Sequence, residues 1–110
     1  MKIPNSVRIG GVEYPVCYEC GLNDGEHILY GEIDYENCAI TLSGDRGTSH
    51  DHRCITLWHE ILHGIRNHAG IVIENEEKVV DMFARGIHQV LQDNCDRLFG
   101  DQRSCEDDLK

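Results

Sequence analysis

Five consecutive residues of this 110-residue chain have the types and the spacing of a metal-binding catalytic motif. His59 and His63 are four positions apart, and Glu60 directly follows the first histidine. On a helix, residues four apart project from one face, one turn apart, which allows two imidazoles to hold one zinc ion. The glutamate then lies beside the metal, where it can accept a proton from a water molecule. The motif therefore predicts a zinc site and hydrolysis of a peptide bond.

The residues around this motif are typical of a helix. Apolar residues between positions 55 and 65 provide faces on either side of the two histidines. Thr48, followed three residues later by Asp51, predicts a capping box at the start of the helix. Gly70 is the residue type that commonly ends one. We therefore expect a helix over residues 49–69.

A catalytic zinc ion needs a third protein ligand and one open position for water. A second helix is predicted from about residue 76 to 94, with Asn75 as its cap and Glu76 and Glu77 in its first turn. Glu77 and Asp81 are four apart and therefore share a face. One of these carboxylates can bind the metal, while the other accepts the outer N–H of a zinc-bound histidine.

The two motifs together resemble those of a known family. An HExxH sequence followed by a helix with the pattern E-x-x-x-D-x-F-A, here residues 77–84, looks like the gluzincin zinc metallopeptidases. The small size and the preceding strands are more similar to the ImmA/IrrE group of short zincin-like peptidases, and to small HExxH proteins of phages and prophages. The resemblance covers roughly residues 30–94, and its specific part is the two motifs.

The resemblance implies a role for each residue of the motifs. The implied zinc ligands are His59, His63 and Glu77, the implied general base is Glu60, and the implied hydrogen-bond partner of a ligand is Asp81. The interval between His63 and Glu77 is short for the family. Glu76 also shares a helix face with Phe83 and Ile87, so Glu76 stays open as the third ligand.

The resemblance further implies a zinc-dependent endopeptidase that cleaves a protein substrate, for example a transcriptional repressor in a phage or mobile-element context. Its reaction needs one further donor to the developing oxyanion, which the sequence does not assign. The candidates for this donor are Tyr30, Tyr35, His50, His52 and His68. An alternative function is a zinc-bound interaction module with little or no turnover, and a third is a structural protein with a chance motif. Glu60 disfavours the interaction module, since a purely structural zinc site needs no general base.

Composition limits the partners and the compartment. The formal net charge of −10 argues against direct binding of nucleic acid, which needs clustered Lys and Arg. Neither an apolar signal-peptide core nor a run of 18 apolar residues is present, so we expect a soluble, cytoplasmic protein without membrane contact. The six cysteines are then expected as reduced thiols, although Cys17 and Cys20 have the C-x-x-C spacing of a metal site. The oligomeric state stays open.

The N-terminal part predicts strands. Val7–Ile9 and Val12–Val16 flank Gly10-Gly11, which suits a hairpin turn, and two further strands are expected over 27–34 and 38–42. The predicted fold is a minimal zincin-like α+β domain over residues 1–100. In it, a small antiparallel or mixed sheet precedes two packed helices that carry the metal site. Residues 101–110 are predicted to form a polar, flexible tail. The 38–42 strand is the predicted sheet edge that would hold a substrate as an added strand.

Overall fold

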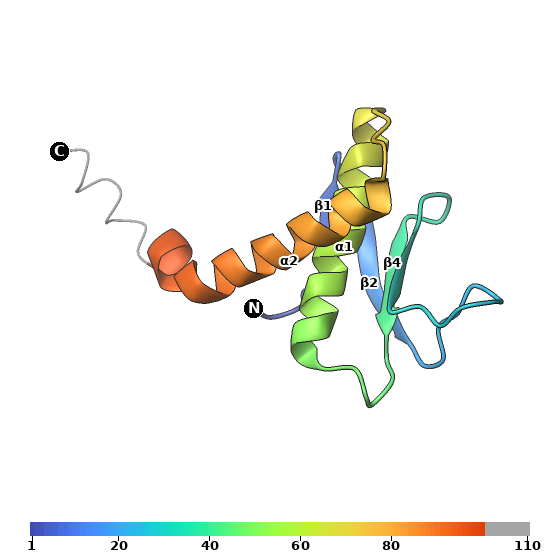
Figure 1. The fold of residues 1–110 in the computed structure, drawn as a ribbon, viewed down its shortest axis with the longest axis horizontal. Coiled ribbons are helices and arrows are strands. Elements are labelled where there is room, and N and C mark those ends of the chain that lie inside the picture. The colour runs from blue at the N-terminus through green and yellow to red at the C-terminus, as the bar shows by residue number, and fades with distance from the viewer. Residues whose placement is uncertain (101–110) are drawn as a thin grey trace.

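The computed structural model describes residues 1–100, which form a four-stranded mixed sheet followed by two helices (Figure 1). The elements in chain order are β1 (Ser6–Ile9), β2 (Val12–Glu19), β3 (Gly31–Asp34), β4 (Ala39–Ser43), α1 (His50–Ala69), α2 (Glu76–Cys95) and the π-helical turn η1 (Asp96–Gly100). The predicted α+β class, with a sheet before two packed helices, is confirmed. The tail predicted over 101–110 lies outside the described residues.

Two hairpins build the sheet. β1 and β2 are antiparallel and are joined by Gly10 and Gly11, whose φ angles of 59° and 80° are the positive values that a two-residue hairpin turn requires. β3 and β4 are also antiparallel and are joined by a turn over residues 35–38. A parallel pairing of β2 with β4 then connects the hairpins and gives the strand order β1-β2-β4-β3.

The prediction that residues 38–42 form the sheet edge is wrong. β4 lies between β2 and β3, and the side chains of Ile40 and Leu42 are fully buried. The open edge on this side is β3, a shorter and more polar strand. Substitution of Ile40 or Leu42 would therefore disturb the core and would not test an edge.

The helix α1 packs against one face of the sheet (Figure 1). The core between them is made by five buried residues, Ile9, Tyr14, Ile40, Leu42 and Leu57. Gly64 allows the closest approach of the helix, because a Cβ there would lie 2.9 Å from the Cδ1 of Ile9 and 3.1 Å from that of Ile33. This close contact fixes the height of α1 above the sheet.

The two ends of α1 differ in how well the sequence predicts them. The cap is Ser49 and not Thr48, since the Ser49 hydroxyl accepts the backbone N–H of His52 at 3.1 Å. The Thr48 side chain instead shares a buried hydrogen bond with the hydroxyl of Ser43. At the other end, Gly70 adopts the left-handed conformation expected of it, with φ 69°.

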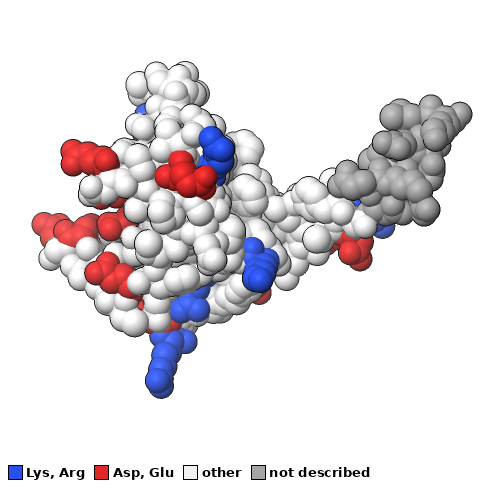
Figure 2. Space-filling view, turned by 180° about the vertical axis from the view of Figure 1, so that it is seen from behind, with Lys and Arg blue, Asp and Glu red and all other residues white. Residues whose placement is uncertain are grey.

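The second helix crosses α1 and then projects away from the domain (Figure 1). Asn75 precedes it in the left-handed region, with φ 58°, and its side chain makes no capping hydrogen bond, contrary to the predicted cap. The projecting part carries few charged side chains on the face shown in Figure 2. Within residues 1–100, neither helix is apolar over a length sufficient to cross a membrane.

A matched pair of glycine substitutions tests the packing of α1. Gly86 lies on α2 in open space, where an added Cβ would meet no atom within 4 Å, so Gly86→Ala should raise the free energy of unfolding by roughly 0.5–1 kcal/mol through helix propensity. Gly64→Ala gains the same propensity but overpacks Ile9 and Ile33, which costs about 1–3 kcal/mol, so its free energy of unfolding should fall below that of the wild type. Urea denaturation followed by circular dichroism measures both. Equal stabilisation by the two substitutions would contradict the close contact at Gly64.

Candidate metal centre

Three side chains from two helices converge at one point. His59 and His63 project from α1 on the same face, and their Nε2 atoms lie 3.1 Å apart. The Glu77 carboxylate approaches from the first turn of α2, with Oε2 3.1 Å from His59 Nε2 and Oε1 2.7 Å from His63 Nε2. The structure thus brings together the three residues that the sequence predicts as ligands.

The spacing of these atoms suits a small divalent cation. Ligand atoms that surround one zinc ion tetrahedrally at about 2.1 Å lie about 3.4 Å from one another. The two Nε2 atoms lie 3.1 Å apart, Glu77 Oε2 lies 3.1 Å from His59 Nε2, and Glu77 Oε1 lies 2.7 Å from His63 Nε2. With one ligand atom taken from each residue, all three atoms lie within 4.8 Å of one another. Two imidazoles and a carboxylate are also the donor set of many catalytic zinc sites. The residues present therefore fit a zinc ion.

A carboxylate lies behind the outer nitrogen of each histidine. Glu76 Oε2 accepts a short hydrogen bond from His63 Nδ1, while its Oε1 lies 2.9 Å from Arg66 Nε. The hydrogen bond with His63 and the pairing with Arg66 lower the pKa of the Glu76 carboxyl below its usual value. Glu76 thus faces His63 from outside the convergence point, and Glu77 faces both Nε2 atoms. Of the two glutamates left open by the sequence, the geometry favours Glu77 as the ligand.

The second supporting carboxylate is Asp81. Its Oδ1 lies 3.6 Å from His59 Nδ1, and its Oδ2 accepts a hydrogen bond from Arg85 Nε at 3.0 Å. The distance to His59 is longer than a hydrogen bond, so the interaction is electrostatic in this geometry. An outer carboxylate of this kind favours the imidazole tautomer that leaves Nε2 free to bind a metal.

Glu60 lies beside this group and is almost fully enclosed. Its exposed fraction is 7%. Burial raises the pKa of the Glu60 carboxyl to about 7, an effect that His63 opposes and that Glu77 and Glu32 reinforce. Gly31 on β3 makes this close packing possible, because a Cβ there would lie 3.4 Å from Glu60 Oε2 and 2.4 Å from Thr56 Cγ2. A side chain at position 31 would push β3 away from the site.

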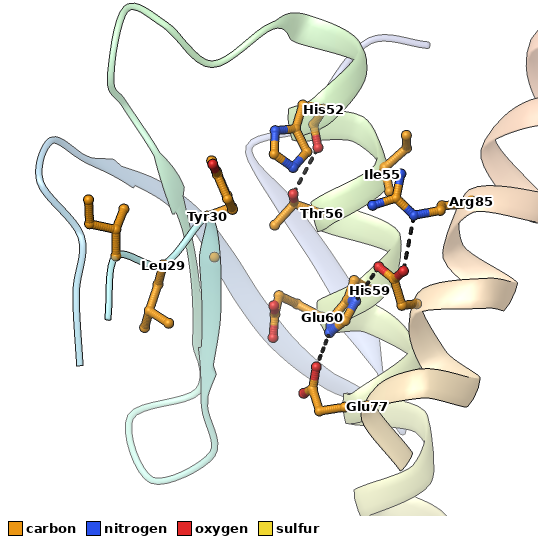
Figure 3. Close-up of a pocket in the computed structure, with 12 residues that line it drawn as sticks. Leu29, Tyr30, His52, Ile55, Thr56, His59, Glu60, Glu77 and Arg85 are labelled. Carbon is orange, nitrogen blue, oxygen red and sulfur yellow. Dashed lines mark hydrogen bonds and ion pairs between the residues drawn. The ribbon is translucent and has the colours of Figure 1, made fainter. Parts of the chain in front are cut away.

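A cavity of about 290 Å³ opens over these residues. Its floor is α1, its walls are α2 on one side and the segment 28–31 on the other, and Figure 3 shows their side chains from these three elements. The described residues that line it include His59, Glu60 and Glu77 at one end and Tyr30 and His52 at the other. The convergence point is therefore accessible to a ligand along α1.

The candidate oxyanion donors separate into two groups. Tyr30 and His52 line the cavity, with their ring centroids 4.2 Å apart. His50 and His68 are engaged elsewhere, since His50 Nε2 lies 2.7 Å from the carbonyl oxygen of Met1 and His68 Nε2 lies 3.1 Å from the Tyr14 hydroxyl. Tyr35 does not line the cavity, although burial raises the pKa of its hydroxyl.

The cysteines of the described residues are not part of this site. Cys17, Cys20, Cys38, Cys54 and Cys95 are all free thiols. Cys17 and Cys20 are exposed near the end of β2, and the Cys20 thiol donates to the carbonyl of Gly44 at 3.5 Å. Within residues 1–100, His59, His63 and Glu77 form the one group with the arrangement of a metal site.

Comparison of the chain with known proteins found no matching family model, no similar curated protein and no similar solved structure. The gluzincin resemblance of the two motifs therefore stays a prediction. Support for a function of this site comes from its own geometry.

Substitutions of the two neighbouring glutamates should have unequal effects on stability in the absence of metal. The Glu76 side chain is 24% exposed and joins His63 to Arg66, so Glu76→Gln should lower the free energy of unfolding by about 1 kcal/mol. The Glu77 side chain is 78% exposed, so water screens its contacts with the two imidazoles, and Glu60 lies beside it. Glu77→Gln should therefore lower that energy by less than Glu76→Gln does. Thermal denaturation in the presence of a chelator compares the two variants. A larger loss in Glu77→Gln would contradict the assignment of Glu76 as the supporting residue.

Proposed function

We propose that this protein is a zinc-dependent endopeptidase of the gluzincin type. The observation that carries the proposal is the convergence of His59 Nε2, His63 Nε2 and the Glu77 carboxylate beside the buried carboxyl of Glu60. Three protein ligands leave a position of a tetrahedral zinc ion open for water and substrate, whereas structural zinc sites commonly have four protein ligands. A base beside an open metal position is the arrangement of a hydrolase.

The chain's own residues have distinct tasks in this proposal. When bound, zinc acts as a Lewis acid that polarises the scissile carbonyl and makes water a nucleophile near neutral pH. Glu60 accepts the proton of the attacking water and passes it to the leaving amine. Glu76 and Asp81 keep the two imidazoles oriented. Of the residues that the sequence offered as oxyanion donors, Tyr30 and His52 line the cavity, and neither is assigned that task.

The open edge of β3 supports a protein substrate. The backbone N–H of Ser43 donates to the carbonyl of Tyr30 at 2.8 Å. Because hydrogen-bonded pairs alternate along antiparallel strands, the backbone groups of Gly31 and Ile33 point away from β4. An extended peptide can pair with these groups and lie over the cavity that contains Glu60. We therefore expect the substrate to pair as an added strand with β3 and not with β4.

The proposed biological role is regulatory cleavage, for example of a transcriptional repressor on a phage or mobile element. This part of the proposal rests on the resemblance of the motifs alone. The cavity is small and open, which favours a substrate that presents an exposed, extended segment.

Metal analysis of five purified proteins tests the proposal. We expect the wild type to hold one zinc ion per chain by inductively coupled plasma mass spectrometry. His63→Ala should lose it, and Glu77→Gln should bind it at least about tenfold more weakly, since a charged ligand is removed. Glu60→Gln should keep the zinc and lose cleavage of a fluorescence-quenched peptide library, because only the base is removed. Glu76→Gln is the matched control for Glu77→Gln and should retain more of the metal.

Other results would contradict the proposal in different ways. A wild type without zinc after purification and zinc dialysis would exclude the metal site. Zinc bound equally in wild type and Glu60→Gln, with no difference between them in any cleavage assay, would favour the alternative of a zinc-bound interaction module.

The close approach of β3 to Glu60 gives a second test. Gly31→Ala should retain zinc but lower kcat/KM on the same peptide library by about tenfold or more, because it displaces the strand that borders the base. Gly47→Ala is the control, since its Cβ would meet no atom within 4 Å. Unchanged turnover in Gly31→Ala, with an intact fold, would show that β3 does not position the reaction.

A further inference from the structure

The cavity continues beyond the candidate metal centre to an end with different chemistry. His52 is seven residues before His59 on α1, which is two turns or about 10 Å along the same helix face. At the His59 end the lining is acidic, with Glu60 and Glu77. At the His52 end it contains an imidazole, an aromatic ring and aliphatic side chains. One ligand can therefore span two distinct environments.

Arg85 supplies the cation of this cavity. Its side chain extends from α2 toward α1, as Figure 3 shows, and is 58% exposed. Within the described residues its hydrogen bond and ion pair are both made by Nε, to Asp81 Oδ2 at 3.0 Å. The two terminal amino groups of the guanidinium have no protein partner there. A guanidinium held by its Nε and open at its other edge suits a bidentate contact with a carboxylate.

The surroundings of Arg85 suit a ligand with an apolar stem. Ile55 on α1 and Leu29 before β3 line the same cavity. Tyr30, itself exposed, lies against the His52 ring with centroids 4.2 Å apart and forms the wall opposite Arg85. Methylene groups can pack on these side chains while a charged tip reaches the guanidinium.

We propose that Arg85 and the Tyr30–His52 wall form a subsite that binds a carboxylate of the peptide substrate. This inference rests on the proposed peptidase function and names its substrate class. An extended peptide rises about 3.3 Å per residue, so the roughly 10 Å between His59 and His52 correspond to about three residues. The carboxylate thus lies two or three residues along the peptide from the scissile bond, which is positioned over Glu60. It belongs to an Asp or Glu side chain or to the end of the peptide chain, and both sources share the same chemistry.

Peptide binding to the zinc-loaded Glu60→Gln protein tests the subsite without requiring turnover. The probes are octapeptides of Ala and Ser with an amidated C-terminus and a neutral fluorophore, in which one Glu or one Gln is moved along the chain. Fluorescence anisotropy should show that the Glu peptide binds roughly tenfold more tightly than the Gln peptide at one or two positions. A matching peptide with a free C-terminal carboxylate, compared with its amide, tests the other source.

The same measurement on two further variants assigns the effect to Arg85. Adding Arg85→Gln should reduce the Glu-to-Gln ratio to about one, because the partner of the carboxylate is removed. Lys78→Gln removes one positive charge from the same helix outside the cavity and should preserve the ratio. Arg85→Gln also removes the hydrogen bond from Arg85 to Asp81. This loss would weaken the binding of Glu and Gln peptides equally, so it would leave the ratio of their affinities unchanged.

The outcomes separate the subsite from the peptidase proposal. The subsite is overturned if Glu and Gln peptides bind equally in every register and the acid and amide forms also bind equally. A ratio that survives Arg85→Gln overturns it as well. Cleavage without any carboxylate preference leaves the peptidase standing and rejects the subsite. A preference that depends on Arg85, with a wild type that binds zinc but cleaves no peptide, supports the subsite and rejects the peptidase.

Discussion

The candidate site depends on the short connection between the two helices. Gly70 and Asn75 both adopt left-handed backbone conformations, with φ 69° and 58°, and only residues 71–74 lie between them. Glycine adopts this conformation without steric cost, and asparagine does so more readily than most residues. The two reversals bring the first turn of α2 against the last turns of α1. The rotation of α2 about its axis at its first turn then decides whether Glu76 or Glu77 faces the histidines.

The concentration of acids around two imidazoles is costly without a counter-charge. Glu60 and Glu77 lie close together in a partly enclosed site, and burial and this repulsion both disfavour ionisation of Glu60. Glu76 shows the opposite behaviour, because its hydrogen bond with His63 and its pairing with Arg66 lower its pKa. The site thus pairs this outer carboxylate with an arginine and leaves its inner carboxylates without one. A divalent cation at the convergence point would compensate the inner pair, which is a physical reason to expect one there.

The sequence predicted well what depends on local chemistry. The Gly10-Gly11 hairpin, the Gly70 helix end and the helix face of His59 and His63 all follow from backbone preference or periodicity. Glu77 was predicted as the third ligand with Glu76 left open as an alternative, because the pattern of a helix does not show how the preceding loop rotates its first turn. The distinction depends on the left-handed conformation of Asn75, which asparagine tolerates but which the helix pattern does not specify.

Local sequence patterns could not predict the contacts between segments, including the pairing of distant strands. β4 alternates in a way that suits either an edge or an interior strand, and only its parallel pairing with β2, more than twenty residues earlier, places it inside the sheet. Thr48 looked like a cap from its spacing to Asp51. Its hydroxyl is instead bound to Ser43 on β4, and the next residue takes the cap. Both misses have the same cause, since each depends on a tertiary contact that the local pattern does not show.

Two facing stripes of side chains account for the shape of the site. On α2, Glu77, Asp81 and Arg85 follow one another at four-residue intervals, so one helix face presents two acids and then a cation to the cavity. On α1, the facing stripe includes His59 and, two turns earlier, His52. The charge of the side chains around the cavity therefore changes along the two helices, from acids near His63 to Arg85 near His52. Because these residues lie in the first half of α2, the site needs only the part of that helix that packs on α1. The projecting second half must be explained by something other than metal binding.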